Sequence, residues 1–226
     1  MLDVAQLVFL PATEPGDATY GAVPEQVAAY PTAKLYQVRF PSLVWYNAAA
    51  RTEAIRQIAA LEPGPVVLIG FSKSGLGAWN IARAIPDRIA ATLIFDAPAA
   101  RAELPPWGTA PFYADDAAWQ EDLPLLHVTD FAAALPRTHK LILISGEGFH
   151  DEMALLARAL SATELDVTFL PRPHLRHHWQ SGWLEDGLAA LLRGDRPADG
   201  SLEANGNLAR EAKAVSGRHV RHLAPR

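Results

Sequence analysis

The sequence lacks cysteine altogether among its 226 residues. That absence excludes disulfides, thiolate zinc sites and cysteine nucleophiles. Charged residues make up only 20% of the chain, and the net charge of -5 is spread without the basic stripe that a nucleic-acid surface needs. The apolar run nearest the N-terminus, Leu7 to Leu10, is far too short for a signal peptide or a membrane span. We therefore expect a cytoplasmic protein that binds neither nucleic acid nor a membrane.

What the sequence does contain is apolar residues, at 50% of the chain, in short runs that alternate with segments of helical period. The runs predict six strands, and the segments between them predict helices. The expected strands are Gln6–Leu10, Leu35–Phe40, Pro65–Gly70, Ala91–Phe95, Leu141–Ser145 and Asp166–Leu170, and the expected helices are Asn47–Leu61, Gly75–Ile85, Glu152–Leu160 and Gln180–Leu192. This alternation implies an α/β fold of three layers, with a mostly parallel sheet and helices on both faces.

The length and patterning fit one domain over residues 1–195. Residues 98–140 interrupt the alternation with a proline- and aromatic-rich insertion, which we expect to act as a cap segment. Its aromatic side chains could line an apolar pocket for the substrate or form the segment's own small core; they are Trp107, Phe112, Tyr113 and Trp119. The polar tail, residues 196–226, lacks an apolar stripe and is expected to be flexible or weakly helical.

The turn Gly70-Phe71-Ser72-Lys73-Ser74-Gly75 directly follows the strand PVVLIG and directly precedes a helix. A sharp turn at this place lifts a serine side chain above the edge of the sheet and needs small residues two positions before and after it. Gly70 and Ser74 meet that need. The spacing of the glycines matches neither of the two common phosphate-binding loops. A turn with only a structural role is the alternative.

This turn resembles the G-x-S-x-G nucleophile elbow of the α/β-hydrolase superfamily, with Ser74 in place of the second glycine. The order of elements over roughly residues 5–193 is similar to that of a small serine esterase of this superfamily. The resemblance implies that Ser72 is the nucleophile and that the backbone N–H of Lys73 faces the oxyanion. It implies a second oxyanion donor after the first strand. Pro11 has no N–H there, so Ala12 or Thr13 would donate, and we take Ala12 as the candidate.

The resemblance places the general base after the last strand, where His174, His177 and His178 lie close together. His177-His178-Trp179 is similar to the H-x-W pattern around the superfamily's catalytic histidine, which favours His177. His178 is the nearer alternative and His174 the more distant one. The spacing of His174 and His178 would suit a metal on a helix, but two nearby prolines and the lack of a carboxylate cluster argue against one. We predict no metal site.

The third member of the triad has several candidates. The resemblance places the acid after the penultimate strand, where the loop offers Glu147 and Asp151, or after the strand before it, where Asp96 follows directly. Asp151 could instead cap a helix, and Asp96 could stabilise a turn. Chain order Ser…Asp…His places Asp151 slightly ahead, and the choice stays open.

Together these patterns predict a serine hydrolase that cleaves an ester or related acyl bond of a small-molecule substrate, without a cofactor. Two alternatives remain. The poorly placed acid would suit a non-catalytic binding protein on the same scaffold, and the same nucleophile could transfer an acyl group to an acceptor other than water. The sequence leaves the substrate and the oligomeric state open.

Overall fold

The computed structural model describes residues 6–11, 34–42 and 44–193, apart from the side chain of Gln180. Ala12 and the tail from residue 196 lie outside the described residues. The strands are β1 (Gln6–Phe9), β2 (Lys34–Gln37), β3 (Val66–Phe71), β4 (Ile89–Phe95), β5 (Lys140–Ser145) and β6 (Asp166–Pro171). The α-helices are α2 (Ala48–Ala59), α3 (Lys73–Ala84), α4 (Asp116–Gln120), α5 (Val128–Ala134), α6 (His150–Leu160) and α7 (Trp183–Arg193), joined by short 3₁₀ turns at Pro86–Arg88, Pro124–His127 and Trp179–Ser181.

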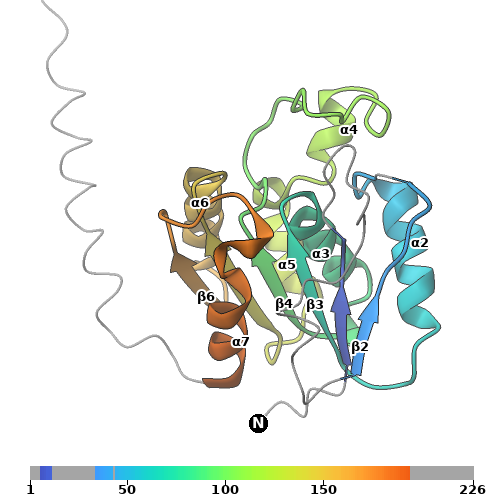
Figure 1. The fold of residues 1–226 in the computed structure, drawn as a ribbon, viewed down its shortest axis with the longest axis vertical. Helices are drawn as coiled ribbons and strands as arrows, with labels where there is room; N and C mark the ends of the chain where they lie inside the picture. The colour runs from blue at the N-terminus through green and yellow to red at the C-terminus, as the bar shows by residue number, and fades with distance from the viewer. Residues whose placement is uncertain (1–5, 12–33, 43, 194–226) are drawn as a thin grey trace, which may run out of the picture. The chain divides into compact units, whose positions relative to one another are not determined.

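The six strands form one sheet in the order β2-β1-β3-β4-β5-β6, and every neighbouring pair is parallel. The strand order reverses between β1 and β3. Strand β2 lies on one side of β1, whereas β3 to β6 follow one another on its other side. Ligand sites of open parallel sheets form beside such a reversal, at the carboxyl ends of the strands. Figure 1 shows these ends pointing toward the part of the molecule that carries α4.

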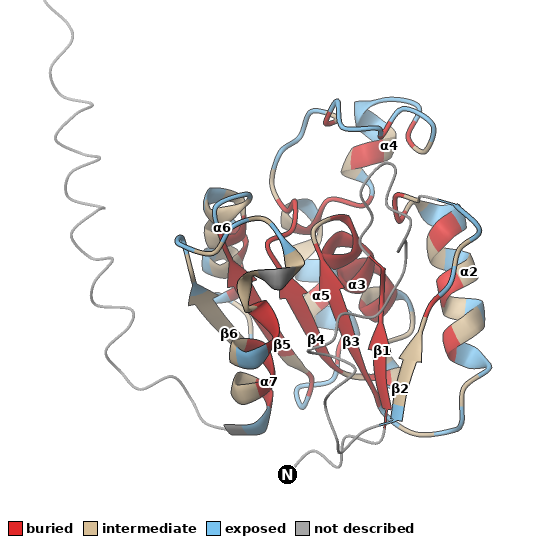
Figure 2. Ribbon diagram, viewed as in Figure 1, coloured by how far each residue is buried: buried red, intermediate tan, exposed pale blue. Residues whose placement is uncertain are grey.

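The central strands are buried on both faces, and Figure 2 shows this as red across the middle of the sheet. All six residues of β3 are buried. Val66 and Leu68 pack into one cluster with residues of α2, α3, α5 and α6, whereas Val67 and Ile69 pack on the opposite face against α7. Buried parallel strands therefore read as continuous apolar runs, and those runs were visible in the sequence.

The predicted fold is confirmed element by element, with shifts of a few residues at the ends. Asn47, the first residue of the predicted helix, caps α2 from outside it, since its side chain accepts a hydrogen bond from the N–H of Ala50 over 3.1 Å. Helix α3 begins two residues earlier than predicted, directly after Ser72. The last helix begins later than predicted, at Trp183, because a separate 3₁₀ turn takes up Trp179–Ser181. No helix among the described residues is long and apolar enough to cross a bilayer.

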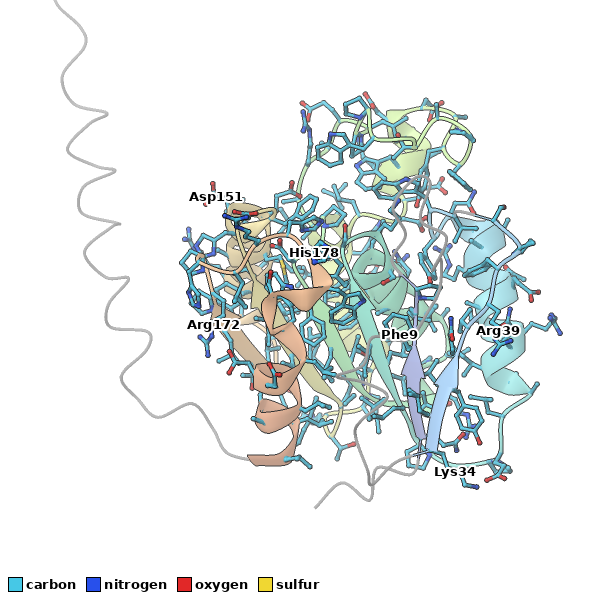
Figure 3. All side chains as sticks on the ribbon, in the orientation of Figure 1. Phe9, Lys34, Arg39, Asp151, Arg172 and His178 are labelled. Atoms are coloured by element: carbon cyan, nitrogen blue, oxygen red, sulfur yellow. The ribbon has the colours of Figure 1, made fainter. Side chains whose placement is uncertain are left out.

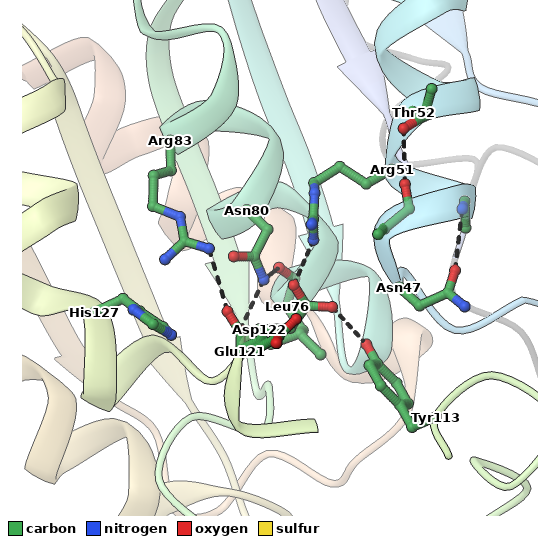
Figure 4. Close-up of polar contacts among 12 residues, drawn as sticks. Asn47, Arg51, Thr52, Leu76, Asn80, Arg83, Tyr113, Glu121, Asp122 and His127 are labelled. Carbon is green, nitrogen blue, oxygen red and sulfur yellow. Dashed lines mark hydrogen bonds and ion pairs between the residues drawn. The ribbon is translucent and has the colours of Figure 1, made fainter. Parts of the chain in front are cut away.

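The insertion carries α4 and α5, and it is joined to the body of the fold by Asp122 (Figure 4). Asp122 is buried, and its carboxylate forms an ion pair with Arg51 of α2 and accepts a hydrogen bond from the hydroxyl of Tyr113 over 3.1 Å. Its carbonyl accepts from the amide of Asn80 on α3 over 2.8 Å. Tyr113 and Trp119 form a small core with Trp45, Leu76 and Leu123, whereas Trp107 stays half exposed.

His139 is fully buried just before β5, and its Nδ1–H donates to the carbonyl of Ile89 over 3.0 Å. Burial lowers the pKa of His139, although the bond to Ile89 opposes that change. The folded state therefore keeps the imidazole neutral at pH values where the unfolded chain, with a histidine pKa near ~6.5, takes up a proton. Because the unfolded state then binds more protons, acid lowers the free energy of unfolding.

We expect the stability of the wild type relative to His139→Phe to fall as the pH drops from neutral to mildly acidic values. The loss attributable to His139 is at most about 2 kcal/mol near pH ~5, the limit set by the ordinary histidine pKa in the unfolded chain. Urea denaturation of both proteins across this pH range measures it. Parallel stability curves for the two proteins would rule out a neutral buried His139.

Candidate active site

The turn from β3 into α3 brings the backbones of strand and helix unusually close together. A Cβ atom built on Gly70 would lie 2.3 Å from the carbonyl oxygen of Ser74, so no larger residue fits at position 70. Ser72, at the apex, has φ 54° and ψ -127°. This backbone conformation is strained for a residue other than glycine and is the kind that recurs at functional sites.

Ser74 braces this turn from inside. Its hydroxyl is fully buried, accepts a hydrogen bond from the N–H of Phe71 and donates one to the carbonyl of Phe71, each over 2.9 Å. The Ser74 side chain, at the start of α3, therefore binds both the N–H and the carbonyl of Phe71, the last residue of β3. The serine that replaces the second glycine of the elbow pattern has a structural task of its own in this chain.

Three side chains from distant parts of the sequence meet in a line at the end of β3. Ser72 Oγ lies 3.0 Å from His177 Nε2, and His177 Nδ1 lies 2.7 Å from Asp96 Oδ2. Asp96 directly follows β4 and has φ 39°. Ser72 and Asp96 are the only residues other than glycine with positive φ in the described ranges, so the strained backbone is concentrated at this line of side chains.

The carboxylate of Asp96 is fully buried and accepts hydrogen bonds from three backbone N–H groups of the loop after β5. Gly146 and Phe149 donate to Oδ1 over 2.8 and 2.9 Å, and Gly148 donates to Oδ2 over 3.1 Å. Burial alone raises the pKa of Asp96, but the bonds from His177, Gly146 and Phe149 outweigh it and hold the pKa below its ordinary value. The carboxylate thus stays ionised and can fix the imidazole with Nδ1 protonated and Nε2 facing the serine.

The His177 ring is packed between two aromatic rings and fixed through its backbone. Phe71 stacks on it with ring centroids 4.7 Å apart, and Phe149 meets it edge to face at 5.3 Å. The N–H of His177 donates to the carboxylate of Glu147 over 3.1 Å, and the N–H of Glu147 donates to the carbonyl of Leu175 over 3.0 Å. These contacts hold the β5–α6 loop against the β6–α7 loop.

The other candidates from the sequence lie elsewhere. Asp151, which chain order slightly favoured as the acid, is exposed in the first turn of α6. Asp96 lies beside the imidazole instead. Figure 3 shows Asp151 on α6 and His178 on the segment after β6. The side chains of His178 and His174 are exposed, and it is His177 that faces Ser72. Glu147 binds the backbone of His177 and not its ring.

Gly148 and Phe71 also position the site, and neither was predicted from the sequence. A Cβ atom on Gly148 would lie 2.7 Å from both Asp96 Oδ2 and His177 Nδ1, so the bare backbone lets the carboxylate and the imidazole meet. The only signal in the sequence is the pair of glycines around Glu147, just after an apolar strand. Phe71 occupies a variable position of the elbow pattern, and nothing local reveals that it stacks on the histidine.

Lys73 is the first residue of α3, so its backbone N–H lies at the positive end of that helix beside Ser72. The residue as a whole is 9% exposed, and its Nζ lies 5.2 Å from the ring centre of Trp45. Ala12 and Thr13, the candidates for the second oxyanion donor, lie outside the described residues. Within those residues no group of three histidine or acidic side chains is arranged to hold a metal ion.

Comparison with known proteins found likeness in structure but not in sequence. No protein-family model matches the sequence, and no curated protein matches it. An S-formylglutathione hydrolase from Agrobacterium tumefaciens matches with TM-score 0.60 and 15% identity, covering 83% of each chain. The fluorophosphonate-binding serine hydrolase F of Staphylococcus aureus matches with TM-score 0.59 and 14% identity, covering 83% of this chain and 82% of that one. A thermostable esterase matches with TM-score 0.51 and 14% identity, covering 84% of this chain and 53% of that one.

Gly148→Ala should weaken the hydrogen bond between Asp96 and His177, because the added methyl group collides with both side chains. The backbone of Gly148 does not have positive φ, so the substitution adds no strain of its own. We expect an upfield shift or loss of the His177 Nδ1–H resonance in the proton NMR spectrum, with the circular dichroism spectrum unchanged. An unaltered resonance would show that the pair tolerates the methyl group.

Ser74→Ala should lower the free energy of unfolding by about 1–3 kcal/mol, because it leaves a buried N–H and a buried carbonyl of Phe71 without this partner. Ser74→Gly, which restores the glycine of the elbow pattern, should lower it by at least as much. Ser161→Ala, at the exposed end of α6, is the matched control. Urea denaturation measures all three, and a neutral effect at position 74 would contradict the bracing role.

Proposed function

We propose that this chain, which has the α/β-hydrolase fold, is a serine hydrolase that cleaves an ester or related acyl bond through Ser72. The fold predicted from the elbow and the order of elements is confirmed by the parallel sheet and by its likeness to solved hydrolase structures. The observation that carries the proposal is the unbroken line from Ser72 Oγ through His177 to Asp96, with spacings of 3.0 and 2.7 Å.

In the proposed mechanism, Ser72 Oγ attacks the carbonyl carbon of the substrate while its proton passes to His177 Nε2. Asp96 stabilises the imidazolium that forms and keeps the ring in the productive orientation. The Lys73 N–H, at the start of α3, donates to the developing oxyanion. The proton on Nε2 then passes to the leaving group, and a water molecule activated by the same imidazole releases the acyl group from Ser72.

The low pKa of Asp96 supports this division of roles. A carboxylate that accepts three backbone hydrogen bonds remains an anion while the imidazole gains a proton, so charge is stabilised where the reaction creates it. The packing of His177 between Phe71 and Phe149 supports it too, because a fixed ring loses little freedom on reaching the transition state.

The first test is Ser72→Ala, measured with p-nitrophenyl esters of short acyl chains. Loss of the nucleophile should lower kcat by at least about 10³-fold and leave the fold intact. Ser161→Ala is the control and should keep full activity. A fluorophosphonate probe should label Ser72 in the wild type. Unlabelled, folded and inactive wild type would favour a non-catalytic binding protein, and products formed on added alcohol acceptors would favour acyl transfer.

The second test compares Asp96→Asn with Asp151→Asn. We expect kcat to fall about 10³–10⁴-fold in the first variant, because an amide cannot hold the imidazole in the required tautomer. Asp151→Asn should behave like the wild type, since its carboxylate lies on the exposed side of α6. Thermal unfolding of both variants separates a lost orientation from a lost fold. The reverse ranking would assign the acid to Asp151.

A further inference from the structure

Aromatic contacts continue from the imidazole out to the surface of the insertion. The edge-to-face contact of Phe149 with His177 is followed by a second one, in which Trp107 meets Phe149 with ring centroids 6.0 Å apart. Trp107 is 50% exposed. We call Phe149 and Trp107 the aromatic ledge. It links the insertion to the ring that faces Ser72 through two successive edge-to-face contacts.

The ledge ends at a positive charge. The guanidinium carbon of Arg101 lies 5.8 Å from the ring centre of Trp107, on its face. Among the described residues no carboxylate forms an ion pair with Arg101, and its side chain is exposed. An arginine stacked on an indole keeps its outward donors, which suit a carboxylate in a two-point hydrogen bond.

The backbone around Arg101 is fixed, although its head is exposed. Its N–H donates to the carboxylate of Glu152 over 3.0 Å, and the same oxygen accepts the N–H groups of Ala99 and Ala100 over 2.9 and 2.7 Å. Its carbonyl accepts a hydrogen bond from the indole of Trp119 over 2.8 Å. Helix α6 and the core of the insertion therefore both hold the segment that presents this cation.

We propose that the aromatic ledge and Arg101 form a substrate subsite, and that the preferred substrates carry a carboxylate separated from the reacting ester by an apolar spacer. The spacer lies along Phe149 and Trp107, and the carboxylate binds Arg101. This inference rests on the proposed hydrolase function of Ser72. The formal net charge of the chain is -5, so a preference for an anionic ester needs a local cation such as this one.

The test uses two pairs of esters that differ by one carboxylate. The spacers are long enough to follow two aromatic rings. Mono-p-nitrophenyl suberate against p-nitrophenyl octanoate places the charge on the acyl side, and 4'-acetoxybiphenyl-4-carboxylate against 4-acetoxybiphenyl places it on the alcohol side. For each pair the ratio of kcat/KM, anionic over neutral, is measured in the wild type and in Arg101→Gln. The pair whose ratio responds identifies the side of the ester that lies on the ledge.

Arg101→Gln should lower the ratio about fivefold in one pair and leave the neutral ester within about twofold, the effect expected of one partly exposed charge. Trp107→Ala should lower kcat/KM for both members of that pair, because it removes the apolar contact. Arg158→Gln, which removes an exposed charge from α6, should leave both ratios unchanged. High salt should reduce the wild-type ratio and have little effect on Arg101→Gln.

An unchanged ratio in both pairs for Arg101→Gln, with hydrolysis of the neutral esters intact, would overturn the subsite and leave the hydrolase function standing. An equal drop in Arg158→Gln would do the same, because the effect would then come from net charge. A folded wild type that hydrolyses none of the four esters and is not labelled at Ser72 would instead remove the proposed function, and the subsite with it.

Discussion

The close passage of β3 into α3 is the constraint on which the rest of the site depends. The two backbones nearly touch at Gly70 and Ser74. Ser72, at the apex between them, therefore adopts positive φ and projects from the end of the sheet. The strain is sustained by its surroundings: β3 is buried along its whole length, and the Ser74 hydroxyl binds both polar groups of Phe71. The same turn places the first N–H of α3 beside the Ser72 side chain.

Asp96, the second residue with a strained backbone, lies at the end of the neighbouring strand β4. Strands β3 and β4 pair in register from Val67 to Phe71, so the residues that follow them emerge side by side at the same edge of the sheet. The loop after β5 supplies backbone donors to Asp96, and its own carboxylate, that of Glu147, binds the backbone N–H of His177. Its glycines matter for a physical reason, since Gly148 leaves room for a carboxylate and an imidazole to approach. The site is thus shared among three adjacent strand ends and one late loop.

The aromatic residues of the insertion between β4 and β5 have two different roles, which its composition did not separate. Some of them form a small core, which the buried Asp122 joins to α2 and α3. Trp107 remains at the surface in contact with Phe149, which packs on His177. The insertion is thus anchored to the body of the fold and still presents side chains beside the site. The backbone of Arg101, for example, is held by hydrogen bonds to Glu152 and Trp119 while its side chain is exposed.

The sequence by itself determined the six strands, the helices between them, the elbow and the loop that carries the histidine. Those features depend on local patterns: apolar runs mark buried parallel strands, and a small-x-Ser-x-small turn marks a tight strand-to-helix bend. Only the tertiary structure decided that Asp96 and not Asp151 meets the imidazole, and that His177 and not His178 faces Ser72. The physical reason is that contacts between residues far apart in sequence depend on the register of neighbouring strands and on the path of each loop. The residues adjacent to these side chains in the sequence specify neither.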